Sequence, residues 1–176
     1  MARQNWNELK NAIVADPASV TGTAEALLVP DWTFNAQEIQ AESVIHGIVH
    51  GKITTDATAG NLTLRLRWGG LAGTSIAASA NFALANSQTD ITWMFEFWIT
   101  CRASGDSTTA MTVIAFGEAA FGAAASSNVP ILVPASAPAQ TASLDGSVAK
   151  ALSVTAQMDN TGNTLQAMSY ALDVLN

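Results

Sequence analysis

The two histidines, His46 and His50, lie four residues apart. On a helix this spacing would place both imidazoles on one face, where they could bind one metal ion. The surrounding segment, SVIHGIVHGKIT, alternates as a strand does, which would put the two side chains on one face but about 13 Å apart. The chain also has no CxxC or HExxH motif. We therefore predict no bound metal and no cofactor, and interpret the pair as polar residues on an outer sheet face or at an interface.

The single cysteine, Cys101, lies near the end of an apolar, strand-like segment. A thiol nucleophile needs a nearby base and an electropositive environment. Arg102 is adjacent in sequence, but strand alternation directs its side chain to the opposite face. Ser104 and Asp106 lie in a Ser-Gly-Asp sequence that is typical of a turn, and the chain contains no GxSxG motif. We predict a cysteine packed in the core and no catalytic nucleophile.

Glu96 and Glu118 are the remaining candidates for catalysis. A glycosidase needs two carboxylates on either side of its substrate. These two would lie on adjacent strands if a hairpin at Ser104 pairs the segments that carry them. Carboxylates on the solvent face of a strand are common, so we predict that the chain is not an enzyme and has no catalytic residues.

The composition limits the possible partners. Charged residues make up 12% of the 176 residues, about half of the usual share, and the net charge is −7. The seven basic residues are scattered, with only Arg65 and Arg67 close together, so we expect no nucleic-acid binding. No segment has the roughly 20 apolar residues of a membrane span. A surface with so few charges favours a protein largely covered by other subunits, and a neutral secreted domain rich in Ser and Thr is the alternative.

The first twenty residues differ from the rest of the chain. Trp6, Leu9, Ile13 and Val14 fit a short amphipathic turn or helix that Asp16-Pro17 would end. This segment lacks the apolar core of a signal peptide, so we expect synthesis in a host cytoplasm. We predict a division into an N-terminal arm, residues 1–22, and one domain, residues 23–176. The arm would either pack on the domain or reach a neighbouring subunit.

Period-two alternation dominates the remainder of the chain and predicts strands with frequent turns. The aromatic segment from Ile91 to Cys101 is the clearest example, because Trp93, Phe95, Phe97 and Ile99 share one face. In the last segment, Met168, Tyr170, Leu172 and Val174 are predicted to share a face. The predicted strands cover residues 24–29, 43–54, 61–68, 75–84, 89–103, 108–118, 147–158 and 164–175, with an extended connection over 122–141. We predict an all-β, antiparallel, jelly-roll-like sandwich with a short N-terminal arm.

Met94 and Trp98 share the nominally outer face of the aromatic strand with Glu96 and Arg102. Large apolar side chains on an outer face often mark an interface. Alternatively, the strand is central and covered on both faces by its own chain. We predict that Trp6, Leu9, Ile13, Met94 and Trp98 contribute to an interface.

Four stretches in order resemble virion structural proteins of tailed bacteriophages, which are short sandwich proteins of the capsid decoration and tail-fibre type. The stretches are HGKITTDATAGNLTLRLRWGG, ITWMFEFWITCRASGDSTT, KALSVTAQMDNTGNTLQ and YALDVL, within residues 43–176. The resemblance is one of strand pattern and turn chemistry, and it carries over no functional residue. It implies a jelly-roll-like fold and a place in the virion, without saying where.

The resemblance and the composition together lead to an expected function. We expect a capsid decoration or cement protein on the capsid surface, forming a homo-oligomer such as a trimer and binding the major capsid protein across subunit joints. The alternative is a tail-fibre or receptor-binding module that recognises a host surface glycan.

Overall fold

The computed structural model describes residues 7–12, 16–105, 110–125 and 129–175. Within these residues nearly all regular structure is β, and the one helical element is a short 3-10 turn, Gly122–Ala124. The strands are β1 (Asn7–Ala12), β2 (Val20–Thr21), β3 (Ala26–Leu27), β4 (Trp32–Phe34), β5 (Val44–Thr54), β6 (Asn61–Trp68), β7 (Thr74–Ala78), β8 (Phe82–Ala83), β9 (Ile91–Ala103), β10 (Met111–Ala120), β11 (Ile131–Val133), β12 (Gln140–Leu144), β13 (Lys150–Met158) and β14 (Thr164–Leu175).

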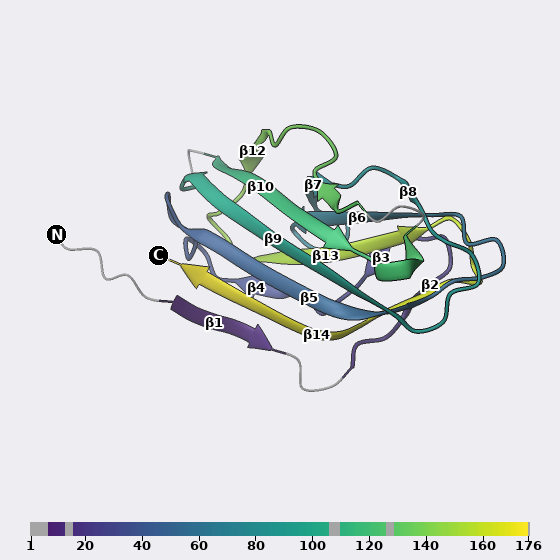
Figure 1. Cartoon of the computed structure of the whole chain (residues 1–176). Helices are drawn as coiled ribbons and strands as arrows, with labels where there is room; N and C mark the ends of the chain where they lie inside the picture. Colours follow the sequence, from purple (N-terminus) through teal and green to yellow (C-terminus); the bar gives the residue numbers. More distant parts are fainter. Residues whose placement is uncertain (1–6, 13–15, 106–109, 126–128, 176) are drawn as a thin grey trace.

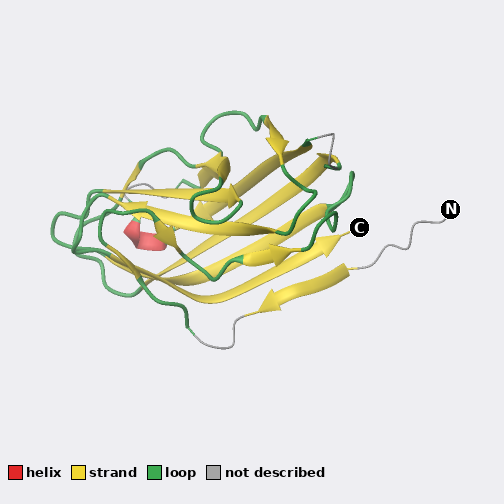
Figure 2. Ribbon diagram, turned by 180° about the vertical axis from the view of Figure 1, so that it is seen from behind, coloured by secondary structure: helices red, strands yellow, loops and turns green. Residues whose placement is uncertain are grey.

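The strands form two antiparallel sheets that face each other (Figures 1 and 2). The large sheet has the order β1-β14-β5-β9-β10-β11, with β2 also paired to β14 and β12 also paired to β10. The small sheet has the order β3-β13-β6-β7, with β4 also paired to β13 and β8 also paired to β6. Figure 1 shows the large sheet in front and the small sheet behind it. The chain is thus an antiparallel, jelly-roll-like β-sandwich, as the sequence predicts.

The core lies between the sheets and follows from the alternation of the long strands. Every second residue of β5, β6 and β9 is buried, while the residues between them are partly exposed. Large aromatic and aliphatic side chains fill the space, including Trp93, Phe95, Phe97, Leu64 and Leu66. The inward face that the sequence assigns to the aromatic strand is therefore confirmed.

A short turn or helix was predicted for the N-terminal segment, and this prediction is wrong for residues 7–12. These residues form β1 and pair with β14, from Asn7 opposite Leu175 to Ala12 opposite Ala171. A helix of so few residues is marginal in water. The free edge of the long strand β14 offers a row of unpaired amide and carbonyl groups instead, and pairing satisfies them. The division into an arm, residues 1–22, and a body stays a prediction.

Three other details differ from the sequence prediction. The single strand expected over residues 75–84 is split into β7 and β8, and the strand expected over 24–29 is reduced to β3. The ladder between β14 and β5 shifts register between Ala167 and Ser169, which is a β-bulge. Met168, which occupies the bulge, is 44% exposed, so it does not share the inward face of Tyr170 and Leu172. Alternation alone cannot locate an extra residue in a strand.

Two inward-facing glycines on β5 make room for aromatic side chains of β9. Gly47 lies opposite Phe97 and Gly51 lies opposite Trp93 in the ladder. A Cβ atom added to Gly47 would overlap the ring of Phe97, and one added to Gly51 would lie 2.8 Å from the Trp93 ring. The paired glycines and rings therefore fix the register of β5 against β9.

Replacing Gly47 with alanine should lower the free energy of unfolding by about 1–3 kcal/mol, because the Phe97 ring must move in a packed core. Denaturant titration of the purified protein measures this. Gly146→Ala is the matched control, because an added Cβ there meets its nearest neighbour, the sulfur of Met111, at an ordinary 3.4 Å. Equal stability of the two variants would contradict the packing argument.

Candidate functional site

The outer face of the large sheet carries one row of aromatic and ionisable side chains. In the ladder, Asp173 of β14 lies opposite His46 of β5, His46 opposite Trp98 of β9, and Trp98 opposite Phe116 of β10. We call these four residues the aromatic row. They come from four strands, of which only β9 and β10 are consecutive in the chain, and antiparallel pairing brings them together.

The rings of the aromatic row stack on one another. The His46 and Trp98 rings lie with centroids 5.2 Å apart, and the Trp98 and Phe116 rings with centroids 6.3 Å apart, both near parallel. His46 Nε2 is 2.8 Å from a carboxylate oxygen of Glu96 in the adjacent row, and His46 Nδ1 is 4.0 Å from Asp173. The imidazole is thus held in place from three sides. The result is a flat apolar strip with carboxylates at its margin.

Glu96 and Glu118 lie directly opposite each other on β9 and β10. The sequence-based placement of this pair on adjacent strands is confirmed. Opposed carboxylates in a sheet repel each other, so the arrangement is unfavourable by itself. The contact of His46 with Glu96 gives that carboxylate a polar partner.

Exposed apolar side chains gather on the same sheet. Among the described residues, every large hydrophobic side chain that is both exposed and part of a strand belongs to the large sheet: Leu9, Phe116, Leu132, Met168 and Leu175. Phe116 is 40% exposed and Leu132 is 49% exposed. Leu9 and Leu132 lie on the outermost strands in the order of this sheet, β1 and β11, so exposed apolar side chains occur from one edge of the sheet to the other, with charged residues between them. Such a surface is typical of an interaction site.

The predicted interface residues have different outcomes. Trp6 and Ile13 lie outside the described residues. Leu9 is 59% exposed on β1, opposite Asp173. Met94 and Trp98 are half-buried on the outer face of the large sheet, on a strand that is central in that sheet. Leu9, Met94 and Trp98 therefore belong to one surface, and their role in an interface stays a prediction.

Cys101 is 1% exposed, as expected for a core cysteine. Burial raises the pKa of its thiol, so the reactive thiolate is disfavoured. His46 and His50 lie on the outer face of β5, in separate rows of the ladder. In the part of the chain that the structure describes, no group of three His, Cys, Asp or Glu residues could hold a metal ion.

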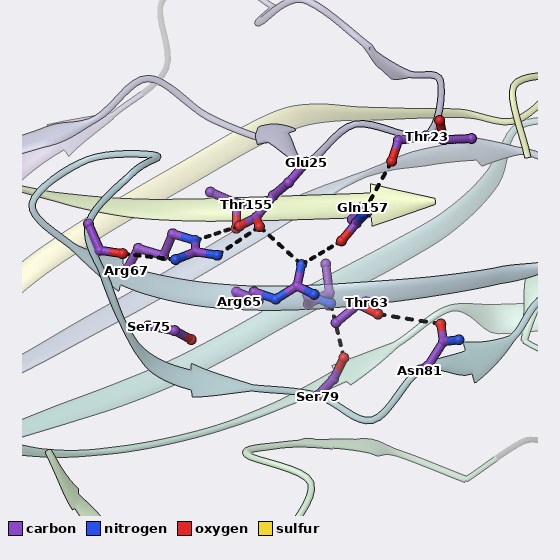
Figure 3. Close-up of polar contacts among 12 residues, drawn as sticks. Thr23, Glu25, Thr63, Arg65, Arg67, Ser75, Ser79, Asn81, Thr155 and Gln157 are labelled. Carbon is purple, nitrogen blue, oxygen red and sulfur yellow. Dashed lines mark hydrogen bonds and ion pairs between the residues drawn. The ribbon is translucent and has the colours of Figure 1, made fainter. Parts of the chain in front are cut away.

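The outer face of the small sheet is polar and is centred on Glu25, between β2 and β3 (Figure 3). The Arg67 guanidinium donates two hydrogen bonds to the Glu25 carboxylate, at 2.6 Å from Nε and 2.8 Å from Nη2. Arg65 Nη1 is 3.2 Å from the second carboxylate oxygen, and the Thr155 hydroxyl donates to the first. Glu25 therefore joins β6 and β13 through side chains, and we call these four residues the Glu25 cluster.

The Glu25 cluster favours the charged form of its carboxylate. The hydrogen bond from Arg67 is the main cause that lowers the pKa of Glu25 below its ordinary value of 4.5, and it outweighs the opposing effect of burial. Asp159, near one end of the cluster, also has a lowered pKa, because the backbone amide and then the side chain of Asn61 donate hydrogen bonds to it. Both groups are thus stabilised as carboxylates.

A cleft of about 460 Å³ opens beside the Glu25 cluster. Its lining comes from four parts of the chain: the loop before β3, strand β6, the connection between β7 and β8, and the C-terminal end of β13. The lining residues are Thr23, Thr63, Arg65, Asn81, Gln157, Met158 and Asp159. This site was not predicted from the sequence. The only signal was the Arg65–Arg67 pair on one face of a strand, and their partner Glu25 is about forty residues earlier in the chain.

No protein-family model matches the sequence, and no curated protein matches it either. Among solved structures, the chain is similar to a legume lectin-like domain from Entamoeba histolytica, with 10% identity, a TM-score of 0.28, and coverage of 94% of this chain and 88% of that one. It is also similar to the PL7 alginate lyase AlyA1 from Zobellia galactanivorans, with 10% identity, a TM-score of 0.22, and coverage of 90% and 62%. Both likenesses are too weak to transfer a ligand or an activity. The described residues contain no helix with the length and apolar character that a membrane crossing requires.

Replacing Glu25 with glutamine should lower the free energy of unfolding at pH 7 by about 1.5–3 kcal/mol, because a charged acceptor of several hydrogen bonds is lost. Since the folded-state pKa of Glu25 is lowered, its contribution is fully present above pH 4.5 and is lost as the pH falls through the folded-state value. Denaturant titrations at pH 7 and at pH 3 should therefore show a difference between wild type and variant that shrinks in acid.

Glu118→Gln is the matched control for this experiment, because Glu118 is exposed and faces Glu96 across the ladder. Its stability should be unchanged or slightly higher at pH 7, since the substitution removes a like-charge pair. A loss at Glu118 as large as that at Glu25 would contradict the role assigned to the cluster.

Proposed function

We propose that this chain is a structural protein of a tailed-phage particle, and that it acts as a capsid decoration or cement protein. The observation that carries the proposal is the gathering of exposed apolar side chains on one face, the outer face of the large sheet, while the outer face of the small sheet is polar. A molecule with two such different faces is suited to lying flat against a partner. The resemblance of its strand pattern to virion proteins supports the particle as that partner.

The mechanism is mechanical. Trp98 and Phe116 form a rigid, pre-stacked strip, so little side-chain entropy is lost when a partner covers them. Aromatic side chains in such positions are typical binding hot spots. The low share of charged residues, 12% of the chain, leaves few hydrated groups to remove on binding. The proposed partners are two further copies of this chain, with which it would form a trimer, and the major capsid protein.

Repetition makes weak contacts sufficient. A symmetric oligomer engages several equivalent positions at once, and linked contacts raise the overall affinity far above that of one contact. The protein needs no catalytic residue for this role. Glu96 and Glu118 would lie at the margin of the contact and favour partners with basic groups there.

Phe116→Ser and Leu132→Ser should each weaken binding to emptied phage heads, and for Phe116 the loss should reach about 30-fold, which corresponds to about 2 kcal/mol for a hot-spot residue. Co-sedimentation of the purified protein with heads measures the affinity, and light scattering of the free protein measures the oligomer. Val148→Ser is the control, because Val148 is 48% exposed in a loop outside both sheets. The proposal would be contradicted if the wild type did not bind heads, or if all three variants lost the same amount of affinity for heads.

Deleting residues 1–12 should also reduce head binding while the body stays folded. The deletion removes β1 and the exposed Leu9, but it leaves the buried Val20 and the pairing of β2 with β14 intact. Near-ultraviolet circular dichroism reports on the packed core, and co-sedimentation reports on binding. Unaltered head binding by a folded truncation would show that the N-terminal segment is no part of the interface.

A further inference from the structure

The cleft beside the Glu25 cluster has the donors and acceptors of a ligand site, and the proposed structural role does not use it. It lies on the outer face of the small sheet, whereas the aromatic row lies on the outer face of the large sheet, on the opposite side of the sandwich. Its volume of about 460 Å³ is within the range of small-molecule sites. A protein attached through its large sheet would keep this cleft open to solvent.

Hydrogen-bond donors remain free in the cleft. Arg65 uses Nη1 for Glu25 and for Gln157 Oε1 at 3.1 Å, and among the described residues nothing pairs with its Nε or Nη2. Asn81 accepts a hydrogen bond from the Thr63 hydroxyl at 3.4 Å, and its amide nitrogen has no partner in the described part of the chain. Arg65, which Glu25 and Gln157 hold in place, and the exposed Asn81 therefore both offer N–H groups to a ligand.

A strong acceptor lines the same cleft. The Asp159 carboxylate is ionised, and it receives its two hydrogen bonds from the backbone and the side chain of Asn61. Each carboxylate oxygen has a further lone pair for an incoming hydroxyl. Donors and a charged acceptor thus line one cavity.

The charges that line the cleft balance. Arg65 contributes one positive charge and Asp159 one negative charge, so the lining favours neither an anion nor a cation. The net charge of the whole chain, −7, further disfavours an anionic ligand. A hydroxyl group both donates and accepts, so adjacent hydroxyls satisfy a cleft that offers both kinds of partner. We infer that the cleft binds a neutral saccharide, with hydroxyls accepting from Arg65 and Asn81 and donating to Asp159.

The site is already organised without a ligand. Glu25 holds the Arg65 guanidinium and is itself held by Arg67 and Thr155. Gln157 is fixed at both ends, because its amide nitrogen donates to the Thr23 carbonyl at 3.2 Å and its oxygen accepts from Arg65. A ligand therefore has little side-chain freedom to remove, which favours binding. Glu25, supported by Arg67 and Thr155, thus positions Arg65.

Titration of the ¹⁵N-labelled protein with glucose, galactose, mannose and N-acetylglucosamine at millimolar concentration tests the inference. At least one sugar should shift the side-chain amide resonances of Asn81 and Gln157 in a saturable way, and the resonances of the large sheet should stay in place. Asn81→Ala should weaken that sugar about five- to tenfold, the loss expected for one hydrogen bond. Asn81 is exposed, so this variant should keep its fold.

Gln140→Ala is the matched control, since Gln140 is an exposed amide on β12 of the other sheet. It should bind the sugar as the wild type does. The inference is overturned if none of the four sugars shifts Asn81 and Gln157, if only galacturonate or inorganic phosphate does so, or if Asn81→Ala binds with unchanged affinity. Head binding by Asn81→Ala, measured separately, distinguishes failure of this site from failure of the structural role.

Discussion

The packing of Phe97 and Trp93 over Gly47 and Gly51 is the constraint on which the large sheet depends. Side chains in a strand alternate between faces, so a slip of one residue would move every core residue to the outside. A slip of two residues would keep the faces but place the rings against branched side chains such as Val49 and Ile53. The glycines thus select one register among those that alternation allows. That register sets His46 against Trp98 and so builds the aromatic row on the other side of the same strands.

The two outer faces differ because their polar groups are used differently. On the small sheet, Arg65 and Arg67 both contact the Glu25 carboxylate, and this network holds charged and amide groups at the surface. On the large sheet, charged residues lie among the apolar side chains, and His46 contacts Glu96 of the neighbouring strand. The first face is therefore suited to hydrogen-bonding a small hydroxylated ligand. The second is suited to contact with a protein surface.

The sequence predicted the long strands and their inward faces well, because alternation of apolar residues is a direct consequence of burial on one side of a sheet. It also placed Glu96 and Glu118 on adjacent strands, since a short turn at Ser104 leaves little choice of partner. It failed where the outcome depends on remote pairing. β1 became a strand because β14 offered an edge, and the contact between Glu25 and Arg67 depends on which strands become neighbours. Neither relation can be inferred from the local sequence.

The order of strands has a consequence for how this chain folds. β13 and β14 come last among the described strands, yet each lies inside its sheet: β14 between β1 and β5, and β13 between β3 and β6. Before residues 150–175 have left the ribosome, the small sheet lacks its central strand and β1 has nothing to pair with. Domains dominated by such distant pairings fold slowly and expose apolar surface while they wait. Both sheets can therefore be completed only after the last strands have emerged, so the C-terminal segment, and not the N-terminal one, sets the moment at which the sandwich can close.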